Sequence, residues 1–175
     1  MANLKLKNPA GGSLNLVSAD GASDLTVTFP ATTGTAMVSG NMPAFGVYGS
    51  TGTSLINNTD TKIVYDTEEF DTNNNFASSR FTPTVAGYYQ LNACILLNVS
   101  SGILGIMLFK NGSRFKYGSQ KLNSTSYVGA PLSTLVYANG STDYFEIFGI
   151  TSGGTATNEG GQIFNYFNGS LVRAA

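Results

Sequence analysis

The chain has 175 residues and a mass of 18.3 kDa, the size of one ordinary domain with a short appendage. With no histidine, one cysteine and 11% charged residues, it cannot form a Ser-His-Asp triad, an ordinary zinc or copper site, or an intrachain disulfide. Its formal net charge of −1 and its lack of a basic run argue against a nucleic-acid-binding surface.

Residues 1–43 differ from the rest because they contain one aromatic residue, Phe29. Residues 1–7 alternate apolar and polar types and lack the apolar centre of a signal peptide, so we expect no leader. Short strands are expected at 14–16, 25–29 and 36–38, before a linker at 39–43. So few short strands are marginal in water, so this arm must dock on another protein or intertwine with copies of itself. The apolar residues available for that anchoring role are Leu14, Leu16, Leu25, Val27 and Phe29.

Residues 44–175 carry nearly all the aromatic residues and form the expected core domain. Turn-forming residues interrupt this part every eight to twelve residues or so, which is typical of an all-β sandwich or barrel. No stretch approaches the roughly 20 apolar residues of a membrane helix, so we expect no membrane insertion. The expected strands are 44–49, 61–65, 88–99, 103–110, 114–120, 128–138, 143–150 and 162–167.

Two hairpins are expected in this domain. Asn111-Gly112 is the strongest hairpin signal in the chain, because both residues accept the positive φ of a tight turn. Residues 132–137 and 144–148 flank a second turn at 138–142, which predicts a hairpin with a longer loop. Near eight strands in this length fit a jelly roll.

The strand at 88–99 predicts two different faces, since side chains alternate along a strand. One face carries apolar residues for the core, among them Tyr89 and Leu91. The opposite face carries amides and no charged residue, which is unusual for a fully wetted surface and suits a subunit interface. The two sets are Tyr89, Leu91, Ala93 and Ile95, and Tyr88, Gln90, Asn92 and Cys94.

Four of the ten acidic residues lie together, at Asp66, Glu68, Glu69 and Asp71. Such carboxylates could bind Ca²⁺, or serve as the paired acids of glycoside hydrolysis. A solvated strand is the favoured interpretation, because alternation would place Glu69 and Asp71 on one face and the other two on the opposite face. Calcium is therefore the one cofactor candidate, and catalysis is not expected.

The remaining candidate sites have ordinary structural interpretations. Cys94 lacks an activating base and is expected to be a buried, inert thiol. The glycines of 49–52 and 153–155 lack the Lys and Ser/Thr ending of a phosphate loop and are expected to form turns. Exposed tyrosines and amides near Tyr117 and at 124–127 could contact sugars, although any β-rich surface uses the same residues.

The order of motifs in 44–175 resembles the C1q/TNF-like jelly roll. Phe81-Thr82-Pro83 followed by Gly87-Tyr88-Tyr89 is similar to the opening of a central strand in that family. Leu108-Phe109-Lys110-Asn111-Gly112, residues 135–145 and Phe167-Asn168-Gly169-Ser170-Leu171 resemble its later motifs. Two extra residues, Ser141 and Thr142, make the third match loose. The resemblance implies a jelly-roll sandwich and a compact homotrimer, with Tyr144, Phe148 and Phe167 as our candidates for packing near the axis.

The arm supplies a second resemblance. Gly12-Ser13-Leu14-Asn15-Leu16 and residues 25–35 are similar to a short module of bacteriophage fibre and virion proteins, and residues 70–89 resemble proteins of marine and cyanobacterial phages. This implies a virion structural protein, with residues 1–43 anchoring a trimeric knob of residues 44–175 to capsid or tail proteins on the head or tail surface. A tail-fibre tip recognising host glycans or proteins is the alternative, and a glycan-degrading enzyme is a remote one.

Overall fold

The computed structural model describes residues 3–7, 9–17, 37–38, 40, 42–98, 102–123 and 127–175. The chain divides into two compact units, Met1–Gly34 and Thr35–Ala175. The expected boundary lay after residue 43, nine residues further along the chain. Met37 packs against the core of the second unit and neither it nor Val38 lies in a strand, so the strand expected at 36–38 is wrong at these two positions.

The first unit contains one antiparallel pair, β1 (Asn3–Lys7) and β2 (Ser13–Val17). Its register places Leu4 opposite Leu16 and Leu6 opposite Leu14. The strand expected at 14–16 is confirmed, while β1 was not expected. The strand expected at 25–29 lies outside the described residues.

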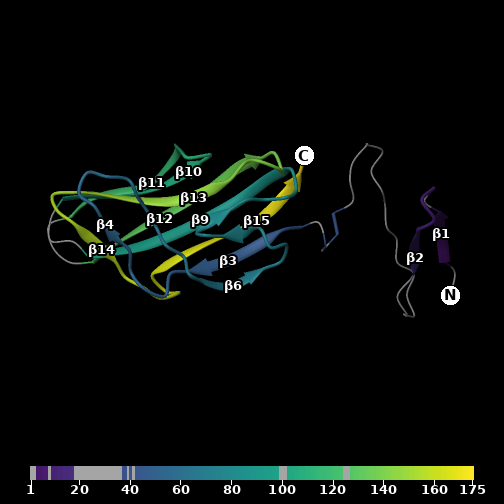
Figure 1. The fold of residues 1–175 in the computed structure, drawn as a ribbon, viewed down its shortest axis with the longest axis horizontal. Coiled ribbons are helices and arrows are strands. Elements are labelled where there is room, and N and C mark those ends of the chain that lie inside the picture. The colour runs from purple at the N-terminus through teal and green to yellow at the C-terminus, as the bar shows by residue number, and fades with distance from the viewer. Residues whose placement is uncertain are drawn as a thin grey trace, which may run out of the picture. The chain divides into compact units, whose positions relative to one another are not determined.

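The second unit is an all-β sandwich of two sheets, as expected (Figure 1). One sheet has six strands in the order β11-β10-β13-β8-β7, with β5 paired to β13. Its strands are β5 (Thr61–Lys62), β7 (Phe76–Ala77), β8 (Arg80–Phe81), β10 (Gly102–Lys110), β11 (Ser113–Asn123) and β13 (Phe145–Ser152).

The other sheet has seven strands in the order β4-β14-β9-β15-β3-β6, with β12 paired along β9. Its strands are β3 (Ala44–Tyr48), β4 (Ser54–Leu55), β6 (Thr67–Asp71), β9 (Gly87–Asn98), β12 (Tyr127–Ala138), β14 (Ala156–Asn158) and β15 (Asn165–Ala174). In the described part of the chain, no helix is long and apolar enough to cross a membrane.

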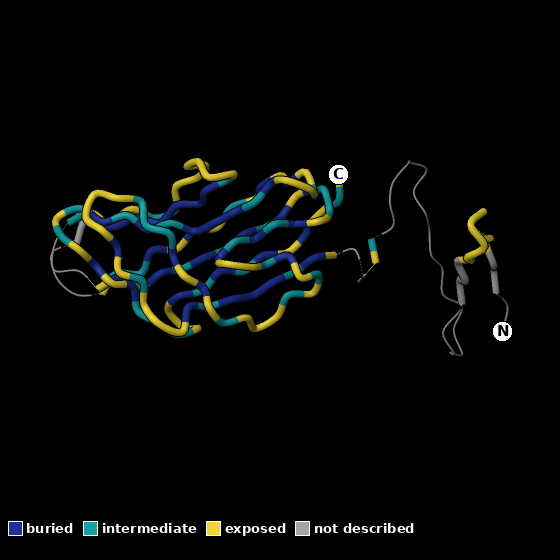
Figure 2. The backbone as a smooth tube through the Cα atoms, viewed as in Figure 1, coloured by how far each residue is buried: buried dark blue, intermediate teal, exposed yellow. Residues whose placement is uncertain are grey.

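The core lies between the two sheets, where the buried positions gather along the strands (Figure 2). Tyr89 and Leu91 on β9 are fully buried, as the alternation predicts. Aromatic rings from both sheets fill the centre: Phe45 stacks on Phe81 with ring centroids 4.2 Å apart, and Phe167 meets Phe45 edge-on at 4.9 Å. Such pairs stabilise a core beyond the area that they bury.

The β10–β11 hairpin is confirmed, and its turn geometry explains it. Asn111 and Gly112 have φ angles of 53° and 78°, and Lys110 pairs with Ser113 across the turn. Positive φ at both central residues is the type I′ arrangement, whose twist matches that of the flanking strands.

The second expected hairpin is wrong, because the strands on either side of residues 139–144 belong to different sheets. β12 pairs with β9 over its whole length, whereas β13 pairs with β10. Asn139 Oδ1 accepts hydrogen bonds from the backbone N–H groups of Ser141, Thr142 and Asp143, each at 3.0 Å. This side-chain cap satisfies the loop's own backbone, so the segment crosses between the sheets instead of closing a two-strand ladder.

The observed strand boundaries differ from the expected ones in two places. The last strand starts at Asn165 and runs to Ala174, later than the expected 162–167, because Phe164 N–H and Asn165 N–H both donate to the carbonyl of Gly161 in a turn. Between 54 and 81 the chain forms five short strands where one was expected at 61–65. Strands of two residues carry too few alternating positions to show a period.

Candidate assembly surface

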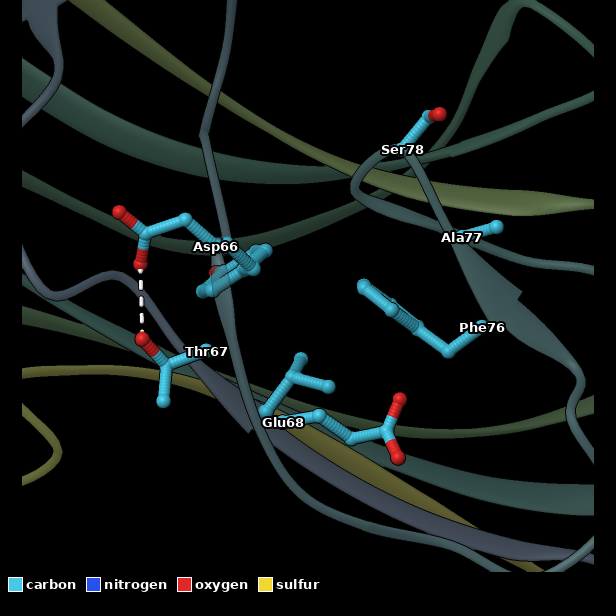
Figure 3. A pocket seen from close by; sticks show the side chains of 8 residues that line it. Asp66, Thr67, Glu68, Phe76, Ala77 and Ser78 are labelled. Atoms are coloured by element: carbon cyan, nitrogen blue, oxygen red, sulfur yellow. Dashed lines mark hydrogen bonds between the residues drawn. The ribbon is translucent and has the colours of Figure 1, made fainter.

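The acidic cluster does not form a converging site. Asp66 accepts hydrogen bonds from the backbone N–H and the hydroxyl of Ser50, both at 2.6 Å. These bonds lower the pKa of the Asp66 carboxyl, and the bond from the hydroxyl contributes more than the bond from the backbone N–H. Figure 3 shows the Asp66 carboxylate, bonded to Thr67, and the Glu68 carboxylate extending in opposite directions from the strand. Asp71 holds a turn by accepting from the N–H groups of Asn73 at 3.3 Å and Phe76 at 2.7 Å.

Glu69 is exposed on β6. Within the described ranges, no group of three or more acidic, histidine or cysteine side chains could hold a metal ion. The structure therefore does not bring together the four carboxylates that the calcium and glycoside-hydrolysis interpretations require.

The other candidates take structural roles. A Cβ on Gly52 would lie 1.9 Å from the carbonyl oxygen of Asn158, so this glycine permits close packing against β14. Gly153 and Gly154 have positive φ angles of 96° and 146°, as turn glycines do. Tyr117 is exposed, and residues 124–126 lie outside the described residues.

The three residues expected near a trimer axis occupy different places. Phe167 is 0% exposed and belongs to the core of the protomer, so its expected place at an interface is corrected. Phe148 stacks on Phe109 at 3.8 Å on the outer face of the six-stranded sheet, and the Arg80 guanidinium lies 3.9 Å from the ring centroid of Tyr144. The place of Phe167 was wrong because the β15 positions that face the core could not be identified before the start of that strand was known.

The outer face of the six-stranded sheet carries ion pairs. Glu146, which is buried, lies 2.7 Å from Lys62 Nζ and 3.0 Å from Arg80 Nε. Desolvation raises the pKa of the Glu146 carboxyl, but the hydrogen bonds from Lys62 and Arg80 outweigh it and leave the pKa below its ordinary value. Arg114 on β11 also donates two hydrogen bonds to the carboxylate of Asp60.

The outer face of the seven-stranded sheet has the opposite character. The outward positions of β3, β9, β12 and β15 carry no charged residue until Arg173, which follows a bulge at the end of β15. This is the face predicted from the amide-rich side of β9. Its central residues are Tyr88, Gln90, Asn92 and Cys94 on β9, Pro131, Ser133, Leu135 and Tyr137 on β12, Tyr166, Asn168 and Ser170 on β15, and Ala44, Gly46 and Tyr48 on β3.

The polar groups on this face bond to one another. Gln90 Nε2 donates to Ser133 Oγ at 3.0 Å, Ser133 Oγ donates to Asn92 Oδ1 at 2.8 Å, and Asn92 Nδ2 donates to Asn168 Oδ1 at 3.2 Å. We call this four-residue chain the amide ladder. A polar group that already has a protein partner loses less when water is removed, so covering these four side chains costs less than covering unbonded ones.

Apolar side chains flank the amide ladder. Leu135 is 53% exposed, and the rings of Tyr88 and Tyr137 lie 5.5 Å apart, centroid to centroid. At the other edge Phe70 on β6 is 49% exposed. We name the outer face of β12, β9, β15 and β3, together with Phe70, the assembly face.

Solved structures of low sequence identity share this architecture. Murine APRIL aligns with a TM-score of 0.58 at 10% identity, over 75% of this chain and 99% of that one. Eiger TNF from S. frugiperda aligns at 0.60 and 10% identity, over 77% and 95%. The globular domain of zebrafish complement 1qA aligns at 0.55 and 16% identity, over 76% and 99%. The fold is the TNF/C1q jelly roll. No protein-family model matches the sequence, and no curated protein does.

The sequence predicted the outward, amide-rich strip of β9, but not the extent of the face around it. Phe70 was not singled out, because it lies among acidic residues that suggested a different chemistry. The contributions of β12 and β15 depend on which strands pair with β9, and pairing is not visible in the alternation of one strand.

Proposed function

We propose that this protein is a homotrimeric structural protein of a bacteriophage virion. Its second unit would assemble through the assembly face, and residues 1–43 would attach it to the particle. The observation that carries the proposal is the contrast between an assembly face whose outward strand positions carry no charged residue before Arg173 and a six-stranded sheet that carries ion pairs on its outer surface.

The contrast between the two faces favours burial of the assembly face. Removing an ion from water costs several kcal/mol unless it is well paired. The outward positions of the assembly face would leave water without that cost before Arg173, because their polar side chains are amides and hydroxyls, four of which bond to one another in the amide ladder. Its exposed Leu135 and Phe70 would gain from burial, at about 25 cal/mol per Å² of apolar surface.

Three copies are supported by the family resemblance. Members of the C1q/TNF family form compact homotrimers, and the chain shares their fold at 10–16% identity. The likeness in fold alone does not fix the number of copies. The proposal of a trimer therefore depends on the assembly face as well as on the resemblance.

The virion role is supported by the arm. Residues 12–16 and 25–35 resemble a module of phage fibre and virion proteins, and a two-stranded pair such as β1–β2 needs cover from another chain to be stable. β3 begins at the end of the sandwich where the C-terminus lies, and the loops beside β14 lie at the opposite end (Figure 1).

The experiment is to locate the protein in purified particles. Mass spectrometry of the virion should detect the chain, and gold-labelled antibodies against residues 44–175 should decorate the particle. Label on the head supports a capsid decoration protein, and label at the tail supports a short fibre or the alternative of a receptor-binding tip. A chain that is absent from particles, but made during infection, contradicts the proposal.

A further inference from the structure

The assembly face contains a hollow close to one of its edges. The residues that line it include Gly46, Glu69, Phe70, Asn92, Asn168 and Ser170, of which Glu69 is charged. Gly46, on the outward side of β3, has no side chain in this hollow, and the Phe70 ring leans over it. A Cβ on Gly46 would come 2.7 Å from Phe70 Cε1, so no other residue at position 46 leaves the ring in place.

An apolar side chain projects from the opposite edge of the same face. Leu135 lies on β12, which pairs with β9 at one edge of the sheet, and it is half exposed. The register places Leu135 opposite Gln90, Gln90 opposite Ser170, and Ser170 opposite Ala44. Leu135 and the rim of the hollow therefore lie in one row, at the same height along the strands.

We propose that Leu135 of one copy occupies the hollow of the next copy, so that three such contacts close the ring. This inference rests on the proposed trimer. Rotation about an axis parallel to the strands keeps every residue at its height, so it brings a projection and a hollow of one row together. The contact joins two different patches of one face, which is a heterologous arrangement, and such contacts form a closed ring when the rotation between copies closes.

Disulfide trapping tests the contact, using the full chain with Leu135→Cys and Ser170→Cys in a Cys94→Ser background. Leu135 and Ser170 of one chain are separated by β9, about 10 Å at the usual strand spacing. Cysteines more than about 7 Å apart do not bridge without backbone movement, so a bond within one chain is disfavoured. Mild oxidation should convert most of the double variant to a covalent trimer on a non-reducing gel.

The controls separate this inference from the proposed function. The C94S chain alone should keep the mass of the unmodified protein, and each single-cysteine variant should stay uncrosslinked. A trimeric double variant that forms no disulfide overturns the contact and leaves the trimer standing. A C94S chain that is monomeric, like the unmodified protein, overturns the proposed function itself. Dimers formed by L135C alone would show a symmetric, isologous contact and overturn the inference.

A second variant tests the hollow without introducing cysteines. Ser170→Trp should fill the hollow and raise the concentration at which the trimer dissociates by at least about 10-fold. Ser113→Trp, on the exposed β10–β11 turn, is the matched control and should leave dissociation unchanged. Equal behaviour of the two tryptophan variants, with both chains folded, contradicts the inference.

Discussion

Asn92 on β9 donates a hydrogen bond of 3.2 Å from its Nδ2 group to Oδ1 of Asn168 on β15. The two residues are direct cross-strand partners at the centre of the assembly face. The bond links β9, where Gln90 lies opposite Leu135, to β15, which lines the hollow. It also gives one N–H of Asn92 and the amide oxygen of Asn168 a protein partner, which lowers the cost of burying these two groups between copies.

Asn92→Asp should therefore weaken the trimer while leaving the protomer folded. The new carboxylate would face Asn168 Oδ1 and would have to leave water on assembly, which costs several kcal/mol. We expect the dissociation concentration to rise by at least about 10-fold, measured by analytical ultracentrifugation at pH 7. Asn74→Asp, on the exposed turn before β7, is the matched control and should behave like the unmodified protein.

Phe167→Ala should destabilise the protomer rather than the trimer contact. The ring is fully buried and packs against Phe45, Tyr65 and Phe76. Removing a buried aromatic ring leaves a cavity and costs about 3–5 kcal/mol. Urea unfolding at several protein concentrations checks this: the loss should persist when all samples are monomeric, and a loss seen only in assembled samples would count against it.

Phe148→Asp gives the complementary result. Phe148 stacks on Phe109 on the outer face of the six-stranded sheet, away from the assembly face. We expect the free energy of unfolding to fall by roughly 1–3 kcal/mol, and the midpoint of unfolding with it, because a charge replaces a half-buried ring. The oligomeric mass of the folded fraction should stay that of the unmodified protein. A folded monomer would instead restore Phe148 to the interface.

Acid should destabilise the protein through two carboxyls. Burial raises the pKa of Asp143, but hydrogen bonds from Lys110, Asn111 and the Asn139 N–H outweigh it, so the pKa of Asp143 lies below its ordinary value, as does that of Glu146. A carboxyl with a lowered folded pKa stabilises the protein above its unfolded value, about 4, and loses that contribution as the pH falls through the folded value. Unfolding free energy should thus fall below about pH 4 and stay nearly flat between ~6 and ~8, since no histidine titrates there.

Asp143→Asn and Glu146→Gln identify the source of that acid sensitivity. Each variant should be less stable than the unmodified protein at pH 7 and should lose less stability on acidification. Denaturant unfolding at steps between pH 2 and 7 measures this. An unchanged acid slope in the double variant would assign the effect to other carboxyls.

The sequence allowed the all-β class, the sandwich and the inner face of β9 to be predicted, because these depend on composition and on a period of two along long strands. It also identified the Asn111-Gly112 turn, where local backbone chemistry decides the geometry. The course of residues 138–142 between the two sheets could not be predicted. It depends on the pairing of β12 with β9, which the local sequence does not show. The hollow beside Gly46 escaped for the same reason, since it combines residues from four strands.

The oligomeric mass of the full chain in solution tests the central claim most directly. Native mass spectrometry or light scattering at micromolar concentration and neutral pH should give three times the 18.3 kDa of one chain. The same measurement on Asn92→Asp should give mainly the single-chain mass. A single-chain mass for the unmodified protein, or a trimer that N92D leaves intact, would contradict assembly through the uncharged face.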